Sequence, residues 1–311
     1  RKLIWLAREA MITRSRDLDA FEHASDLDVR LVDCGGGLQF AAIGVKPERR
    51  LLLESLYGFL TLKNGVPIGY VLATALFGSS EVAFNVFETY RGGESALIFS
   101  RVLAAVRHLF GSDAFTVDPY QLGYANTEGL KSGAWWFYYK LGFRPDDPAV
   151  RKVLTGELRQ LARNPRHRSS IATLGKMASE NVYFHLGRPR GDVLGKVSLG
   201  DIGLKVARTI ADRFGADRER AAKVMSREAD RMLGVRSLAG FSAGEKLAWD
   251  RWAPLVMSLP GASGWSAADK RALVKIIRAK GGRRETDFVR LSDRHRRLRR
   301  ALLALAEEEP A

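Results

Sequence analysis

Hydrophobic and polar positions alternate along the first part of the chain, which is the pattern of strands with one buried face. Glycines at Gly35–Gly37 interrupt the first alternating segment and indicate a turn. Asn64–Gly65 separates two later segments and suits the positive φ angles of a tight hairpin. The expected strands lie within 29–45, 56–62, 67–76 and 82–87. These segments predict an antiparallel meander.

Segments with helical periodicity precede and follow this meander. Apolar residues at helical spacing predict an N-terminal helix within 1–24. A second helix is expected over Ala96–Leu109 and ends at Gly111, followed by a short strand at Ala114–Val117. Another helix is expected over Glu128–Leu141, ending at Gly142. A strand, a glycine turn, a helix and a strand in this order predict a parallel crossover at one end of the sheet.

Helical spacing dominates after Pro148, and a strand pattern returns only weakly at Asn181–Leu186. Ser242 with Glu245 has the spacing of a capping box, and Ser266 shortly before Asp269 is typical of a helix start. The expected helices are 149–163, 200–214, 217–233, 242–258, 266–280 and 284–308. The fold class predicted from these patterns is α+β, with a mostly antiparallel sheet flanked by helices and followed by an all-helical C-terminal domain. The predicted domains are 1–148, a connecting helical region 149–195, and a basic all-helical domain 196–311.

Charge divides the chain into two unequal halves. The 311 residues carry a net charge of +15, but residues 1–150 sum to −1 and residues 151–311 to +16. Between Arg271 and Arg300 alone the net charge is +9. Such a surface predicts an anionic partner, nucleic acid or an acidic protein, for residues 271–300. Arg-rich helices with solvated faces are the simpler interpretation. Trp249, Trp252 and Trp265 are expected in the core rather than as stacking platforms.

Other features narrow the class of protein. The single cysteine, Cys34, leaves no intrachain disulfide, fits a reducing compartment, and is expected to be an incidental thiol rather than a nucleophile. The five histidines show no ligand spacing, so no metal site is predicted. No apolar run approaches the ~20 residues that a membrane span needs, and the first ten residues lack the apolar core of a signal peptide. The expected localisation is cytoplasmic.

Two motifs carry the candidate chemistry. The first, in residues 86–97, is a strand that runs into Arg91-Gly92-Gly93-Glu94-Ser95 and then a helix. Glycines let backbone N–H groups approach phosphate oxygens, and a helix N-terminus adds positive potential. The second motif begins at Asn126 and ends in Tyr138-Tyr139-Lys140-Leu141-Gly142-Phe143-Arg144-Pro145.

The two motifs in this order, after the Asn64–Gly65 hairpin, resemble the GNAT superfamily of acyl-CoA N-acyltransferases over residues 1–148. The resemblance implies an acyl-CoA N-acyltransferase-like fold, with acetyl-CoA or another acyl-CoA as co-substrate and an unidentified amine as acceptor. By the same resemblance Tyr138 is the candidate general acid. The candidate bases are Glu88 and Glu81, both on the strand that leads into the loop; the simpler alternatives are a loop-bracing role for Glu88 and a surface charge for Glu81. The implied cofactor-binding residues are Arg91, Gly92, Gly93, Ser95, Ala96 and Asn126.

The sequence departs from the family pattern at two positions. Glu94 stands in the loop where the family prefers glycine, and a carboxylate there would repel a pyrophosphate unless it turned towards solvent. Asn126 lies twelve residues before Tyr138, farther than the usual seven. Tyr138 also shares a helical face with Trp135 and Tyr139, so packing is an alternative role. Two functions therefore stay open: an active acyltransferase, or a catalytically degenerate binding module whose basic helical domain docks to an anionic partner.

Overall fold

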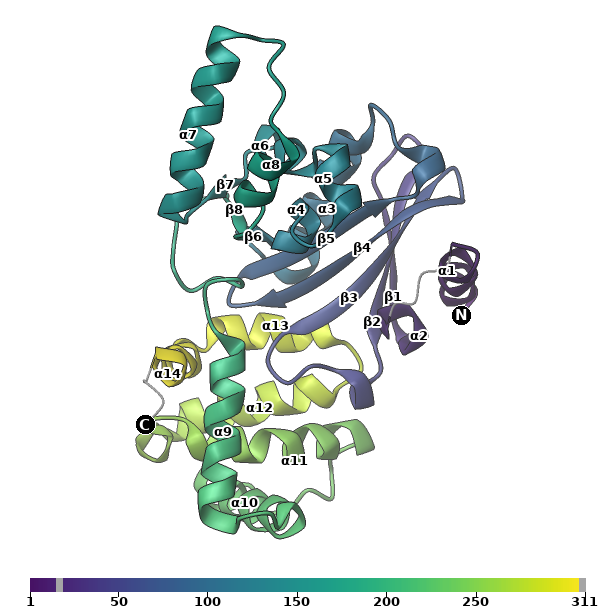
Figure 1. Ribbon diagram of the computed structural model, residues 1–311. Helices are drawn as coiled ribbons and strands as arrows, with labels where there is room; N and C mark the ends of the chain where they lie inside the picture. The colour runs from purple at the N-terminus through teal and green to yellow at the C-terminus, as the bar shows by residue number, and fades with distance from the viewer. Residues whose placement is uncertain (15–18, 308–311) are drawn as a thin grey trace.

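The computed structural model describes residues 1–14 and 19–307 (Figure 1). An eight-stranded sheet runs through the molecule in the order β1-β2-β3-β4-β5-β6-β8-β7. The strands are β1 (Ala24–Asp33), β2 (Leu38–Val45), β3 (Ser55–Lys63), β4 (Val66–Leu76), β5 (Ser79–Val86), β6 (Ala114–Val117), β7 (Arg144–Pro145) and β8 (Val182–His185).

Strands β1 to β5 form the predicted antiparallel meander, so this expectation is confirmed. The turn between β3 and β4 lies at Asn64 and Gly65, whose φ angles are 50° and 79°. Both angles are in the left-handed region, which an Asn-Gly pair tolerates best. The predicted crossover is also confirmed, because β5 leads through α3 (Ser95–Phe110) to a parallel β6. Gly111 ends α3 in a left-handed conformation, as expected.

The helix expected over 128–141 is two helices. After α4 (Pro119–Leu122), the chain forms α5 (Thr127–Ser132) and α6 (Ala134–Lys140), which Gly133 separates with a φ of 69°. The left-handed Gly133 caps α5 and starts α6 in a new direction. This correction matters for the site, because Asn126 and Tyr138 stand on different helices.

The weak strand pattern near residue 181 is a full member of the sheet. The chain passes through α7 (Pro148–Arg163) and α8 (Ile171–Met177) before it enters β8. Strand β8 then lies between β6 and β7 and is antiparallel to both. The sheet is thus completed by a segment beyond residue 148, and the predicted domain boundaries remain predictions.

Helices cover the two faces of the sheet differently. On one face, α1 (Lys2–Ile12) and α2 (Asp19–Glu22) pack on the first strands around Phe21 and Leu60. On the other face, α3 and α13 (Glu285–Arg294) lie against β4, and α13 also contacts α3. One continuous hydrophobic core joins this face to the C-terminal helices, and it includes the predicted core residues Trp249, Trp252 and Trp265.

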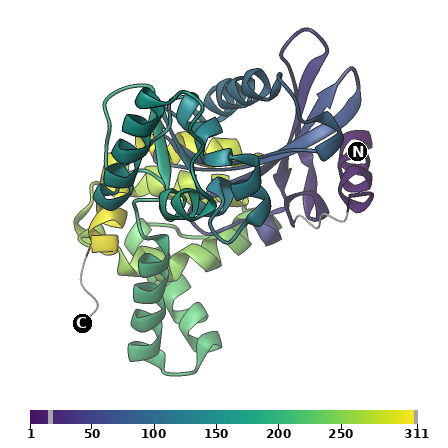
Figure 2. The ribbon, with the colours of Figure 1, turned by 45° about the horizontal axis from the view of Figure 1, so that its top comes forward.

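The C-terminal helices gather along one side of the sheet in both orientations (Figures 1 and 2). They are α9 (Leu199–Phe214), α10 (Arg218–Leu233), α11 (Ala243–Ser258), α12 (Ala267–Gly281), α13 and α14 (Arg296–Glu307). The capping box of Ser242 and Glu245 and the cap at Ser266 are confirmed. The single helix expected over 284–308 is wrong, because the helical path breaks at His295. There the His295 ring accepts a hydrogen bond from the Leu298 amide at 3.0 Å and starts α14.

A buried polar network fastens the C-terminal helices to the sheet. Lys280 Nζ lies 2.6 Å from Glu285 Oε1, and it also donates to the Glu54 carbonyl at 2.9 Å. The Arg50 guanidinium donates to the carbonyls of Lys280 and Gly282, at 2.6 and 2.7 Å. Because this network joins positions more than 200 residues apart, it fixes α12 and α13 on the sheet.

A second part of the same network lies at the start of α13. The amide of Glu285 donates to Asp28 Oδ2 at 3.0 Å, and the amide of Thr286 donates to the Tyr57 hydroxyl at 3.1 Å. The Tyr57 hydroxyl donates in turn to Asp28. Side chains of β1 and β3 therefore satisfy the first free amides of α13, which would otherwise be buried without partners.

The predicted fold class is confirmed at the level of a mixed α+β chain with a mostly antiparallel open sheet and a helical C-terminal region. Within residues 1–14 and 19–307, no helix combines the length and the apolar character that crossing a bilayer requires.

Candidate functional site

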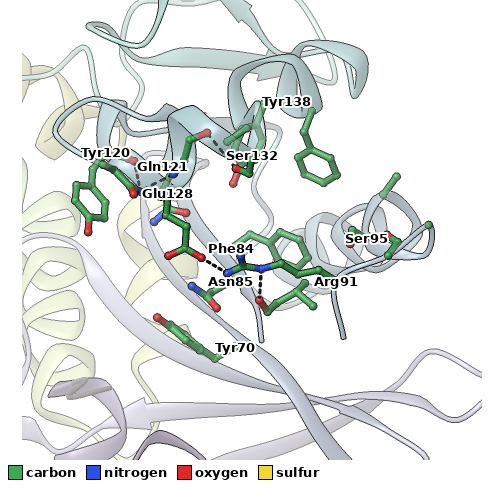
Figure 3. Close-up of a pocket in the computed structure, with 18 residues that line it drawn as sticks. Tyr70, Phe84, Asn85, Arg91, Ser95, Tyr120, Gln121, Glu128, Ser132 and Tyr138 are labelled. Atoms are coloured by element: carbon green, nitrogen blue, oxygen red, sulfur yellow. Dashed lines mark hydrogen bonds and ion pairs between the residues drawn. The ribbon is translucent and has the colours of Figure 1, made fainter. Parts of the chain in front are cut away.

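A pocket of about 490 Å³ lies beside the second half of β5, beyond the point where the pairing of β5 with β6 ends. Strand β6 pairs with β5 at Ser79–Glu81, and no described strand pairs with the later residues of β5 on that side. Phe84 and Asn85, on opposite faces of β5, both line the pocket. The pocket therefore reaches from one face of the sheet towards the other, with α4, α5 and α6 as its far wall (Figure 3).

The glycine loop forms the near wall. Gly92 and Gly93 line the pocket, and their amides make no hydrogen bond within the described residues. Glu94 follows as the N-cap residue of α3 and makes no capping hydrogen bond with its side chain; the helix itself begins at Ser95 and has no acidic residue in its first turn. A helix N-terminus and unpaired amides together attract an anion.

Arg91 reaches across the pocket to the far wall. Its Nε donates to the Val86 carbonyl at 3.1 Å, and its guanidinium forms an ion pair with Glu128 of α5 (Figure 3). Neither side chain is buried, so the ion pair is weak and open to competition by another anion. Glu128 is a pocket residue that the sequence did not predict, because its partner lies 37 positions away.

Asn126 lines the pocket and also shapes its wall. Its side-chain oxygen accepts from the Gly129 amide at 3.1 Å and caps α5. Its side-chain amide donates to the Tyr120 carbonyl at 2.9 Å. Both ends of the Asn126 side chain thus hold α4 and α5 together, which gives this residue a structural role besides its predicted contact with the cofactor.

Tyr138 lies at the inner end of the pocket. The residue is 3% exposed, and its ring packs against Phe99, Phe137 and Phe143. Within the described residues its hydroxyl makes no hydrogen bond. Burial raises the pKa of Tyr138, so the phenol keeps its proton at any ordinary pH.

All the predicted cofactor-binding residues and Tyr138 line this one pocket, although they span 48 positions of the chain from residue 91 to residue 138. Glu88 does not line it. Glu88 is exposed in a 3-10 turn at Glu88–Tyr90. Glu94 is not in the pocket lining either: its carboxylate lies 3.6 Å from Lys63 Nζ and is largely exposed. Glu94 thus faces the β3–β4 hairpin rather than an anion in the pocket.

Glu81 is the one acidic residue of β5, and its pKa is strongly shifted. Burial raises its pKa to about 7, and the nearby carboxylates of Asp118 and Glu54 add to the shift. Glu81 is absent from the pocket lining, but it lies on the same face of β5 as the pocket residue Asn85. Pocket residues that the sequence did not predict also include Tyr70 and Tyr120.

Glu81→Gln is expected to remove a pH dependence of stability. A carboxyl whose folded pKa lies above its unfolded value stabilises the fold at low pH, and this contribution disappears as the pH rises from about 4.5 to 7. At pH 8 the variant should be more stable than the wild type by about 2–3 kcal/mol, and at pH 4.5 nearly equal to it. Urea unfolding at both pH values measures this. Parallel pH profiles for the two proteins would contradict the prediction.

Cys34 and the metal-ligating residue types do not indicate a second catalytic or metal site in the described residues. Burial raises the pKa of the Cys34 thiol, which makes a poor nucleophile. Within the described ranges, no group of three or more His, Cys, Asp or Glu side chains has the arrangement of a metal site.

Comparisons with known proteins give no further assignment. No protein-family model, no curated protein and no solved structure matches this chain. The chemistry of the pocket therefore has to be argued from its own residues.

Proposed function

We propose that the chain is an acyl-CoA-dependent N-acyltransferase of the GNAT type, and that the pocket beside β5 binds the acyl-CoA. The observation that carries this proposal is the convergence of the glycine loop, the N-terminus of α3 and Tyr138 on one pocket. The volume of about 490 Å³ lies within the range of roughly 300–1,000 Å³ that is typical of small-molecule sites.

The residues around the pocket suit the parts of such a ligand. The unpaired amides of Gly92 and Gly93 fit pyrophosphate oxygens, and Arg91 can exchange Glu128 for a phosphate. Phe84 and Phe137 give an apolar wall beside Tyr138 for the acyl and thiol end. The orientation of Glu94 towards Lys63 supports a working loop.

The reaction would join an amine nitrogen to the thioester carbonyl carbon and break the carbon–sulfur bond. The departing thiolate would take the phenolic proton of Tyr138, the attacking nitrogen would pass its surplus proton to a base, and proton exchange with solvent would then return Tyr138 and the base to their starting states. Glu88 remains the base expected from sequence. The pKa of Glu81, about 7, is matched to neutral pH, but Glu81 does not line the pocket, so it would take the proton through an intervening water.

Calorimetric titration with acetyl-CoA tests the proposal. The wild type should bind, Arg91→Ala should bind about 10–100-fold more weakly because it loses charge-assisted hydrogen bonds, and Glu128→Gln should bind more tightly because the competing carboxylate is gone. Glu94→Gln, whose side chain faces Lys63, is the matched control and should bind as the wild type does.

Each outcome separates the two functions. Binding together with thiol release in the presence of a mixture of amines and peptides supports an active transferase. Binding without thiol release would assign the chain to the degenerate module instead. Absence of binding by the wild type and by Glu128→Gln would refute both versions of the acyl-CoA site.

A further inference from the structure

The C-terminal helices form a second feature, separate from the pocket: a hollowed surface with a large excess of positive charge. One hollow of about 510 Å³ lies between α12, α13 and α14, and a smaller one of about 270 Å³ adjoins it. Lys275 of α12 lines both hollows and joins them. We call this the basic surface; its cationic residues are Lys275, Arg278, Arg284, Arg294, Arg296, Arg297 and Arg300.

Most of this charge is not neutralised within the protein. Arg297 pairs with Asp269 at 3.2 Å, and Arg278 pairs with Glu245 at 2.9 Å. The other five cations are exposed and form no ion pair within the described residues; they are Lys275, Arg284, Arg294, Arg296 and Arg300. A surface that holds five unpaired cations attracts a polyanion.

The break at His295 gives this surface a fixed shape. The buried His295 ring donates from Nε2 to the Asp269 carbonyl at 3.0 Å, while its Nδ1 accepts from the Leu298 amide. Arg294 therefore ends α13, and Arg296 and Arg297 begin α14, beside a rigid corner. The first turn of α14 carries cations and no acidic residue, an arrangement that the positive end of the helix dipole disfavours. A bound phosphate would reverse this penalty.

The composition of the surface selects among anionic partners. None of the large apolar side chains exposed in the described part of the chain lies within 267–307. Insertion into a membrane and docking of an apolar protein surface both need such side chains. Stacking of single-stranded bases needs exposed aromatic rings, which are also missing from this part of the described chain. The sugar-phosphate backbone of a duplex needs only cations and amides.

We propose that the basic surface binds the phosphate backbone of double-stranded nucleic acid without reading its bases. The surface contributes up to five otherwise unpaired cations, and each phosphate that they neutralise releases condensed counterions. The affinity should therefore fall steeply with salt, with a slope of log K against log salt of about −4 to −5 if each of the five meets one phosphate.

The test is fluorescence anisotropy of a short labelled DNA duplex with the full chain, titrated at salt concentrations between about 50 and 200 mM. The triple variant Arg294→Gln/Arg296→Gln/Arg300→Gln should bind at least 10-fold more weakly, and its salt slope should shrink by about 2.7 because up to three phosphate contacts are lost. The matched control is Arg218→Gln/Arg220→Gln/Lys223→Gln on α10, which removes the same charge from exposed positions elsewhere. The control should stay within about twofold of the wild type.

Circular dichroism of both variants verifies that they are folded. Equal losses in the two triple variants would overturn the proposal, because the net charge and not this surface would then carry binding. Tighter binding to a single strand of the same length, to vesicles rich in phosphatidylserine, or to tripolyphosphate alone would also overturn it. None of these readouts depends on acyl transfer, so the result is independent of the proposed function.

Discussion

Lys280→Met is expected to lower the free energy of unfolding by about 3–5 kcal/mol, since it removes one partner of a buried ion pair and strands the other. The Lys280 side chain is 4% exposed, and that of Glu285 is fully buried. Burial lowers the pKa of Lys280 and raises that of Glu285, while their mutual attraction opposes both shifts. Without Lys280, the one cation left beside the Glu285 carboxylate in the described part of the chain is Arg50, at 3.8 Å.

The position of this pair makes the effect large. Lys280 lies in the last turn of α12, Glu285 begins α13, and the Lys280 ammonium also donates to the Glu54 carbonyl beside β3. Losing the ammonium therefore loosens the contact between the C-terminal helices and the sheet as well as the pair itself. Urea unfolding followed by circular dichroism measures the change.

Two further variants test whether a loss of stability in Lys280→Met comes from the buried ion pair. Lys280→Met/Glu285→Leu should recover only part of the lost stability: it no longer leaves a buried carboxylate without its ammonium, but the buried Arg50 guanidinium loses its anion and keeps only hydrogen bonds to backbone carbonyls within the described residues. Lys275→Met changes an exposed, unpaired lysine of the same helix and should stay within about 0.5 kcal/mol of the wild type. A loss in Lys280→Met no larger than in Lys275→Met would show that the pair contributes nothing.

The sequence predicted those parts of the fold whose signals are local. Alternating strands and the Asn64–Gly65 turn gave the meander, because each strand pairs with the next one along the chain. The two helix breaks were missed for a shared reason. Apolar residues keep helical spacing on both sides of Gly133 and of His295, so the sequence pattern shows no break. The helix ends there because of capping contacts: the left-handed Gly133 caps α5, and the His295 ring accepts from the Leu298 amide. Strand β8 was a weak pattern because it is only four residues long.

The candidate site was predictable only in part. The resemblance pointed to the glycine loop and to Tyr138, and both line the pocket. The ion pair of Arg91 with Glu128 and the raised pKa of Glu81 depend on tertiary contacts that no spacing reveals. The same holds for the buried network, where Asp28 and Glu285 meet across 257 positions. A single sequence therefore does not reveal long-range polar contacts, whereas it does reveal local turns and the buried faces of helices and strands.

Tyr138→Phe is expected to lower the rate of acyl transfer by about 10²-fold while leaving acetyl-CoA binding nearly unchanged. If Tyr138 protonates the leaving thiolate, the substitution removes the proton donor and keeps the ring that packs against Phe99 and Phe143. Because the raised pKa of Tyr138 keeps the phenol protonated, the wild-type rate should show no loss from its ionisation near neutral pH. Stability should not fall, since the deleted hydroxyl makes no hydrogen bond within the described residues.

Tyr139→Phe is the matched control, because it makes the same chemical change one position along α6 and outside the pocket lining. Tyr139 stacks on Trp135 and lies beneath the Arg144 guanidinium, so its role is in packing. The rate of thiol release from acetyl-CoA with a mixture of amines and peptides, and calorimetric affinity for acetyl-CoA, separate catalysis from binding. A rate for Tyr138→Phe equal to that of Tyr139→Phe would mean that Tyr138 only fills the inner end of the pocket. A rate loss confined to Tyr138→Phe, with unchanged affinity, would make the buried phenol the acid that the reaction needs.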